Sequence, residues 1–138
     1  MNAGTYVLEP SALERMPGDQ KLSIERVVFP QMVADKSLFA MSTDDYWIDA
    51  GRPDTFISAN VHVSKRVVKE TDAPIHPTAN VAATAVILDS VVGENATVLD
   101  GAHITHSVLL PGAQIGQGAV VIDSLVMGKV GANSQVTN

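Results

Sequence analysis

The acidic residue Asp49 stands in an unusual place, between the bulky apolar run at 46–48 and the Gly-Arg-Pro phrase at 51–53. Because aspartate is a poor strand former, its presence at the end of an apolar strand needs a reason. Asp49 is either a turn or cap residue, or a carboxylate held in place to meet a charged ligand. The phrase by itself leaves both interpretations open, so the surrounding elements have to be considered.

Composition restricts the classes of protein to which the chain can belong. The net charge of −6 over 138 residues argues against a surface for nucleic acid or anionic membranes. The sequence contains no cysteine, which excludes disulfides, thiolate catalysis and cysteine-based zinc sites. No apolar run is long enough to span a bilayer, and no signal peptide is recognisable. We therefore expect a cytoplasmic globular protein.

The second half of the chain, residues 75–138, contains a repeat. The phrases ILDSVV, ITHSVL and VIDSLV place Ser90, Ser107 and Ser124 at a spacing of 17 residues. The residue four places after an aliphatic position is usually alanine, and it is larger at Val91, Val108 and Leu125. The aliphatic positions themselves recur in steps of six, six and five, at Ile75, Val81, Ile87, Val92, Val98, Ile104, Leu109, Ile115 and Val121.

This pattern is typical of a hexapeptide repeat, in which each six-residue unit forms one face of a triangular prism. We expect the aliphatic side chain to point into the prism and the residue four places later to turn inward as well. Three faces make one coil, and backbone hydrogen bonds join successive coils. The pattern predicts a parallel β-helix, well marked over 75–125, and similarity to hexapeptide-repeat proteins implies a left-handed one. After Val126 the repeat continues out of phase, with Val130 and Ser134 fitting the rule.

The first half, residues 1–67, is predicted to be mixed α/β. We expect strands in GTYVL, LFAMS and YWI, and helices in PSALERM, in IERVVFPQMVAD behind a Ser23 cap, and in PDTFISANVHVSKRV. This half has too few strands to close a core comfortably, so it is interpreted as the end of a larger domain. Residues 68–74, VKETDAP, are the expected linker to the β-helix domain at 75–138.

Four phrases in this order resemble one enzyme family. NAGTYVLEPSAL, SIERVVFPQMV and LFAMSTDDYWIDAGRPDTFISAN, followed by hexapeptide repeats, are similar to the C-terminal part of the sugar-1-phosphate nucleotidyltransferases. Within that family they are most similar to the mannose-1-phosphate guanylyltransferases, or GDP-mannose pyrophosphorylases. The resemblance covers nearly the whole chain. It implies the synthesis of GDP-mannose from mannose-1-phosphate and GTP, with release of pyrophosphate.

The resemblance gives Asp49 a role. In the family, the aspartate of a W-x-D-x-G phrase is one of two carboxylates that bind Mg²⁺, and residues 47–51 match that phrase. Mg²⁺ offsets the negative charge that builds up in phosphoryl and nucleotidyl transfer. Gly51 lets the backbone turn closely beside the ligands. The resemblance therefore implies that Asp49 binds the metal and that Asp49 and Gly51 bind substrate.

Three more residues match substrate-binding phrases of the family. Asn2 and Gly4 belong to the NAG phrase, where an amide side chain suits sugar hydroxyls and a glycine permits close backbone approach. A strand-entry turn is the alternative interpretation of these two residues. Glu25 belongs to the SIE phrase and would accept hydrogen bonds from sugar hydroxyls. Its alternative is a first-turn glutamate that the helix dipole favours.

Other phrases of the family have no counterpart in the sequence. The G-x-G-[ST]-R-L-x-P loop, whose backbone N–H groups cradle a triphosphate, is absent. We expect the chain by itself to lack a complete catalytic set, to be inactive, and to be a fragment of a longer enzyme. In the complete enzyme the partners would be a sugar-1-phosphate, a nucleoside triphosphate and Mg²⁺. We expect a homo-oligomer formed through the β-helix, without nucleic-acid or membrane partners.

Two other functions remain open at this point. A hexapeptide-repeat acyltransferase would need a histidine base. The chain offers His62, His76, His103 and His106. Because His103 and His106 flank the inward Ile104, we expect both to face outward. The third hypothesis is a structural or regulatory β-helix that mediates assembly or binds an effector.

Overall fold

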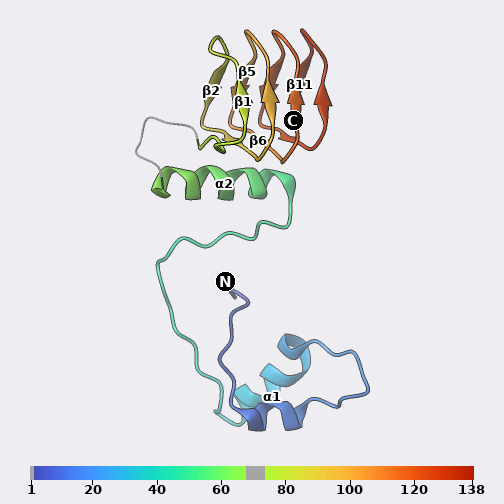
Figure 1. Ribbon diagram of the computed structural model, residues 1–138. Coiled ribbons are helices and arrows are strands. Elements are labelled where there is room, and N and C mark those ends of the chain that lie inside the picture. Colours follow the sequence, from blue (N-terminus) through green and yellow to red (C-terminus); the bar gives the residue numbers. More distant parts are fainter. Residues whose placement is uncertain (1, 68–73) are drawn as a thin grey trace. The chain divides into compact units, whose positions relative to one another are not determined.

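The computed structural model describes residues 2–67 and 74–138, and its contacts divide the chain into two compact units, Met1–Trp47 and Ile48–Asn138. The first unit contains a 3₁₀ helix at Pro10–Arg15, a π-helical segment at Ile24–Val28 and helix α1 at Phe29–Ala34. The second unit contains helix α2 at Pro53–Val67 and all strands found among the described residues (Figure 1). Each unit is described by itself below.

The strands are short and follow one another closely along the chain. Their bounds are β1 Asn80–Val81, β2 Val86–Leu88, β3 Val91–Val92, β4 Thr97–Val98, β5 His103–Thr105, β6 Val108–Leu109, β7 Gln114–Ile115, β8 Val120–Ile122, β9 Leu125–Val126, β10 Lys129–Val130 and β11 Gln135–Thr137.

Every strand pairs in parallel with the strand one coil away, which makes three parallel sheets. The first sheet has the order β1-β4-β7-β10, the second sheet β11-β8-β5-β2, and the third sheet β3-β6-β9. The pairs Val98↔Ile115 and Ile104↔Val121 have the predicted spacing of 17 residues. Figure 1 shows the strands stacked in this way as successive coils. The parallel β-helix predicted from the hexapeptide repeat is therefore confirmed.

Most of the predicted inward positions form the core of the β-helix, but Ile75, in the first coil, is 43% exposed and lies outside it. Val98, Ile104, Ile115 and Val121 are each at most 1% exposed, and Leu109 is completely buried. The small residues behind them are buried just as completely, at Ala96, Ala102, Ala113 and Ala119. Short side chains are needed at these positions because the chain turns a corner there and the prism narrows. In the first coil, Val81 and Ile87 are only partly buried, because they cover the end of this core.

One part of the inward rule is wrong. Val91, Val108 and Leu125 were expected to turn inward, but they point outward from the third sheet and pack in a separate cluster with residues of α2. The reason is the five-residue step that precedes the next aliphatic position at this corner. Ser90, Ser107 and Ser124 fill the interior there instead, with exposures of 0%, 0% and 7%.

The change of phase near the end of the chain has a simple structural cause. Val130 pairs with Ile115 and is 9% exposed, so it points inward as its residue type predicted. The connection from β9 to β10 contains only Met127 and Gly128, whereas the connection from β6 to β7 contains four residues, 110–113. This corner is therefore two residues shorter, and the spacing between paired strands falls from 17 to 15.

Helix α2 covers the outer side of the third sheet. Ile57 and Val61 lie one helical turn apart and are 2% and 6% exposed. They pack against Val108, which is 3% exposed, and against its neighbours in the sheet. Figure 1 shows α2 running alongside the β-helix. Lys65 adds an ion pair with Asp89 at 2.9 Å. The helix thus buries the outward aliphatic row that the hexapeptide rule does not explain.

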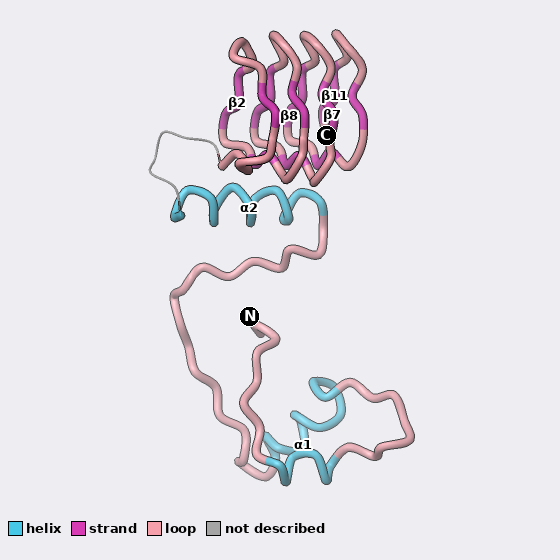
Figure 2. Tube along the Cα trace, viewed as in Figure 1, coloured by secondary structure: helices cyan, strands magenta, loops and turns pink. Residues whose placement is uncertain are grey.

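In the first unit the predicted helices are present, but the predicted strands are not. Ser23 accepts the backbone N–H of Arg26 at 3.3 Å, as expected for a cap, and α1 begins at Phe29 beside the disruptive Pro30. The strands expected in residues 4–8, 38–42 and 46–48 are wrong, and Figure 2 shows these segments as loops. A strand requires a neighbouring strand that shares its backbone hydrogen bonds. The described residues 2–67 contain no strand that could serve as this neighbour.

Two further observations concern the connection and the helices. Most of the predicted linker, residues 68–73, lies outside the residues that the structure describes. No helix within residues 2–67 and 74–138 is both long enough and apolar enough to cross a membrane.

Candidate functional site

The turn at the start of the first unit is built by Asn2 and Gly4. The Oδ1 atom of Asn2 accepts the backbone N–H of Gly4 at 2.9 Å. Gly4 has a φ of +72°, a left-handed conformation that glycine adopts without a steric penalty. A Cβ atom at Gly4 would meet nothing within 4 Å. Glycine is therefore required here by the backbone conformation, and the structure does not show crowding around it.

Asn2 and Glu25 meet although they are distant in the sequence. The Nδ2 atom of Asn2 donates to Glu25 Oε1 at 3.2 Å and to the hydroxyl oxygen of Tyr6 at 2.7 Å. The Tyr6 hydroxyl in turn donates to the same Glu25 oxygen. Glu25 is placed by the first turn of the helical segment that Ser23 caps. The structure thus joins two residues expected from the sequence, and it adds Tyr6.

Tyr6 was missed because its type suggested a strand core. Its ring contacts Phe29 edge-on, with a centroid distance of 4.8 Å and an interplanar angle of 83°. The hydrogen bond to Glu25 is the largest cause that raises the pKa of Tyr6, and burial and the Glu25 charge add to it, whereas the bond from Asn2 lowers it. The signal available in the sequence was the tyrosine four residues after Asn2 in NAGTY.

Asp49 and Gly51 form a tight turn in the second unit, just before α2. The Oδ1 atom of Asp49 accepts the backbone N–H of Gly51 at 3.0 Å. A Cβ atom at Gly51 would lie only 3.1 Å from that oxygen, so glycine allows the carboxylate to approach the backbone. Asp49 therefore serves as a turn residue in this structure, and its exposed carboxylate also remains accessible to a ligand.

The residues next to this turn are engaged with the first turn of α2. Arg52 forms a two-point ion pair with Asp54, with both nitrogen–oxygen distances at 3.1 Å. Desolvation acts to raise the pKa of Asp54, but the backbone N–H of Thr55 and the Arg52 guanidinium outweigh it and lower the pKa. Arg52 thus stabilises the start of the helix. Trp47 is 45% exposed, and its Nε1–H donates to Ala3 O at 3.2 Å within the first unit.

Asp49 fits a magnesium site as one contributor. Mg²⁺ binds hard oxygen ligands and commonly takes only one or two protein carboxylates, with substrate phosphates and water completing the octahedron. Within the described part of the chain, no three acidic or histidine side chains are grouped to hold a metal ion. The carboxylate oxygens of Asp49 are therefore ligands of the kind that Mg²⁺ prefers when phosphate and water complete its shell.

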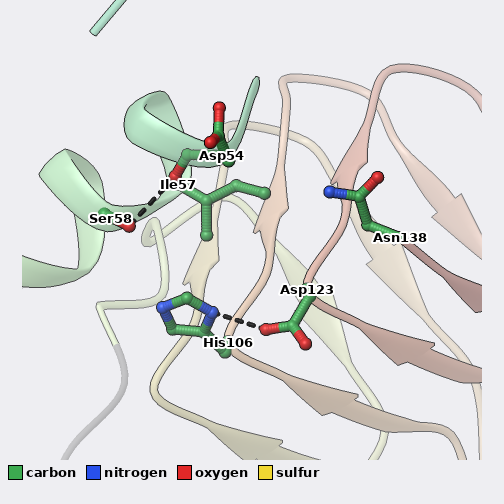
Figure 3. A pocket seen from close by; sticks show the side chains of 6 residues that line it. All are labelled: Asp54, Ile57, Ser58, His106, Asp123 and Asn138. Atoms are coloured by element: carbon green, nitrogen blue, oxygen red, sulfur yellow. Dashed lines mark hydrogen bonds and ion pairs between the residues drawn. The ribbon is translucent and has the colours of Figure 1, made fainter. Parts of the chain in front are cut away.

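A hollow of about 270 Å³ lies between α2 and the β-helix (Figure 3). Its lining includes His106 and Asp123, which come from successive coils and form a contact of 2.6 Å between Nδ1 and Oδ1. Two other polar groups of the lining are also engaged, because Asp54 pairs with Arg52 and the Ser58 hydroxyl donates to the Asp54 carbonyl at 3.0 Å. As expected, His103 and His106 flank the buried Ile104 and face outward.

Comparison with known proteins assigns the chain to a family. The family model described as the GMPPB C-terminal domain matches residues 69–138. A mannose-1-phosphate guanylyltransferase of Mycobacterium tuberculosis is 27% identical and aligns with 88% of the chain and 36% of its own length. A mannose-1-phosphate guanyltransferase of Hypocrea jecorina is 32% identical, with 91% and 39% covered. A UTP–glucose-1-phosphate uridylyltransferase of Synechocystis is 25% identical, with 94% and 41% covered.

The chain spans about two fifths of the length of these relatives. Their alignments include both units, whereas the family model covers just over half of the chain, including all of the β-helix. The resemblance that was first carried by the sequence phrases is thereby confirmed. The chain belongs to the family of the GMPPB C-terminal domain and is similar to the C-terminal region of mannose-1-phosphate guanylyltransferases.

Proposed function

We propose that this chain is the sugar-binding end and the β-helix of an enzyme that makes GDP-mannose from mannose-1-phosphate and GTP, with release of pyrophosphate. The observation that carries the proposal is the alignment of about nine tenths of the chain with mannose-1-phosphate guanylyltransferases. Uridine and glucose are the alternative base and sugar, since one relative is a UTP–glucose-1-phosphate uridylyltransferase. At 25% identity it is less similar to the chain than the two guanylyltransferases, at 27% and 32%. GTP is abundant in the cytoplasm, and we propose that location.

The proposed division of labour follows the sequence-based boundaries. Residues 1–67 would be the end of a catalytic domain, 68–74 a linker, and 75–138 the β-helix. Asn2, Gly4 and Glu25 would lie at the sugar, and this assignment is supported by the hydrogen bonds that join them. The printed sequence has no G-x-G-[ST]-R-L-x-P phrase, so we propose that this chain alone does not turn over GTP.

Asp49 and Gly51 would lie at the phosphates. The turn between them fixes one carboxylate oxygen on the Gly51 N–H and leaves the other for a cation. A bound Mg²⁺ would supply neutralisation of phosphate charge, which nucleotidyl transfer requires. Asp49 orients its carboxylate through this turn, and Gly51 keeps the space beside it free of a side chain.

The proposal is tested by nuclear magnetic resonance titration of the chain with D-mannose 1-phosphate in the presence of Mg²⁺. We expect the backbone amide signals of Asn2, Gly4 and Glu25 to shift, and those of the β-helix core to stay in place. A parallel titration with D-glucose 1-phosphate measures the preference for mannose. Unshifted signals for residues 2–51 at millimolar mannose 1-phosphate would contradict the proposed sugar site.

One observation favours an acyltransferase as a second candidate. Asp123 orients His106 through Nδ1, which is the arrangement that prepares an imidazole to act as a general base. This candidate predicts release of coenzyme A from acetyl-CoA with a hydroxyl acceptor, and loss of that activity in His106→Gln. An inactive wild-type chain in this assay would exclude it.

The β-helix is also proposed to mediate assembly of the enzyme into a homo-oligomer. The three faces of the prism differ in chemistry, and the outward side of the third sheet is already covered by α2. The outward residues of the second sheet include Val86 and Leu88, which are 38% and 56% exposed. Sedimentation of the chain at several concentrations tests this proposal. Association is the expected result, and a monomer that persists at every concentration would contradict it.

A further inference from the structure

Both polar atoms of the Asn2 side chain form hydrogen bonds within the first unit. Its Oδ1 atom accepts the Gly4 N–H at 2.9 Å, and its Nδ2 atom donates to Tyr6 at 2.7 Å and to Glu25 at 3.2 Å. A primary amide has two N–H donors. Both partners of Nδ2 are protein groups, so Asn2 has no spare donor for a sugar in this arrangement. Its contribution is exerted through the groups that it holds.

Tyr6 links Asn2 to Glu25. Its hydroxyl accepts from Asn2 Nδ2 and donates to Glu25 Oε1. The ring cannot drift easily, because Phe29 packs against it edge-on at 4.8 Å. Tyrosine is 36% exposed here, so the hydroxyl network lies at an accessible surface. The position of the carboxylate is thus tied to a ring that is fixed by packing.

The two carboxylate oxygens of Glu25 differ in their hydrogen bonds. Its Oε1 atom accepts from both Tyr6 and Asn2. Its Oε2 atom receives none of the hydrogen bonds recorded between this carboxylate and the described residues. The carboxylate is exposed, negatively charged and oriented through one oxygen. The other oxygen can therefore accept a hydrogen bond from outside, and it repels phosphate.

We propose that Tyr6 and Asn2 are positioning residues that hold the Glu25 carboxylate so that Oε2 receives a hydroxyl group of the ligand. The inference rests on the proposed function, because the hydroxyl would belong to the sugar of a sugar phosphate. It changes the expected role of Asn2, which acts here through Glu25 and does not touch the sugar with its own amide. It also adds Tyr6 to the residues on which sugar affinity depends.

The positioning half is tested without any ligand, by following the Tyr6 ring carbon signal in a pH titration. The variant Tyr46→Phe removes the other tyrosine signal. We expect Glu25→Gln to lower the pKa of Tyr6, because it removes the hydrogen bond from the hydroxyl to a carboxylate and, in addition, the negative charge of that carboxylate. We expect Asn2→Ala to raise it, because the bond from Asn2 favours the ionised phenol. An unchanged Tyr6 pKa in both variants would overturn the positioning role.

The ligand half is tested with two probes, D-mannose 1-phosphate and inorganic phosphate. We expect Tyr6→Phe to weaken binding of mannose 1-phosphate by about tenfold, the usual effect of losing one charge-assisted hydrogen bond. Binding of inorganic phosphate should stay the same, because phosphate has no sugar hydroxyl to donate to Oε2 and is repelled by the Glu25 charge. Equal mannose 1-phosphate affinities of wild type and Tyr6→Phe would overturn the inference.

The two tests separate this inference from the proposed function. If the wild-type chain does not bind mannose 1-phosphate, the proposed function and the ligand half both fail. Opposite shifts of the Tyr6 pKa in Glu25→Gln and Asn2→Ala would still establish the network. Phe29→Leu serves as a control for packing, since it leaves every polar atom of the network in place and should weaken binding less than Tyr6→Phe does.

Discussion

The hydroxyl oxygen of Ser107 accepts the backbone N–H of Ser124 at 3.0 Å in the interior of the β-helix. Ser90 makes the same bond to Ser107 one coil earlier, again at 3.0 Å. Each hydroxyl also donates to a carbonyl two residues before it, as Ser107 does to Thr105 O at 2.8 Å. A buried column of serines therefore joins successive coils at the corner where α2 packs outside.

Ser107→Ala is expected to destabilise the β-helix by about 1–3 kcal/mol, because it leaves the buried Ser124 N–H without an acceptor. The free energy of unfolding in urea measures this loss. Ser134→Ala is the matched control, since Ser134 is exposed in the last coil and should change stability by only a few tenths of a kcal/mol. Equal effects of the two substitutions would contradict a structural role for the column.

Ala102→Glu is expected to unfold the β-helix. Ala102 is completely buried at a corner of the prism, and an unpaired carboxylate cannot be accommodated there. Circular dichroism during thermal melting would show the loss of the cooperative transition. Gln114→Glu places the same charge on the exposed outer side of β7 and should melt like the wild type. A normal melting curve for Ala102→Glu would refute the inward assignment.

Ile57→Ala is expected to loosen α2 from the third sheet at a cost of about 2–5 kcal/mol. Ile57 is 2% exposed and belongs to the cluster that contains Val108. Hydrogen exchange of the α2 amides should speed up, whereas the amides of β5 and β8 should remain protected. Val63→Ala removes a β-branched residue from the exposed side of the same helix, where Val63 is 55% exposed, and provides the control. Similar exchange in both variants would mean that α2 is not anchored through Ile57.

Two substitutions of Asp49 separate its turn from its proposed metal role. Asn at this position keeps an oxygen that can accept the Gly51 N–H but removes the charge, so Asp49→Asn should melt normally and lose Mg²⁺-dependent binding of GDP-mannose. Asp49→Ala should lose both the hydrogen bond to the Gly51 N–H, which lowers its melting temperature, and the Mg²⁺-dependent binding of GDP-mannose. Calorimetric titration with and without Mg²⁺ measures the binding, and Asp45→Asn is the control for an exposed carboxylate nearby. Undiminished magnesium dependence in Asp49→Asn would remove Asp49 from the metal site.

The parts of the fold that could be predicted are those in which side-chain type and spacing depend on local geometry. The six-six-five steps correctly marked Ile104, Ile115 and Val121 as inward, because each coil repeats the same three corners. The same rule failed at Val91 and Val108, where the partners belong to helix α2, an element outside the repeat. Spacing within a repeat carries no information about what packs against its outer surface.

The site shows the same division. The sequence singled out Asn2 and Glu25 from separate phrases, and the structure joins them by a hydrogen bond of 3.2 Å. Tyr6 escaped notice because GTYVL was expected to be a strand, and strand formation depends on a neighbouring strand that residues 2–67 do not provide. For Asp49, the turn was one of the two interpretations from the outset, and the bond to Gly51 establishes it.

The sequence by itself determined the β-helix and the family, because periodic burial and ordered phrases are both written in consecutive residues. Only the tertiary structure decided that Ser107 is interior while Val108 faces α2. It also decided that the Asn2 amide donates its hydrogen bonds to Tyr6 and Glu25. The physical reason is that hydrogen bonds and packing between distant segments depend on where the backbone brings their atoms. Residue type alone states what a side chain can bind, and the fold selects which partner it reaches.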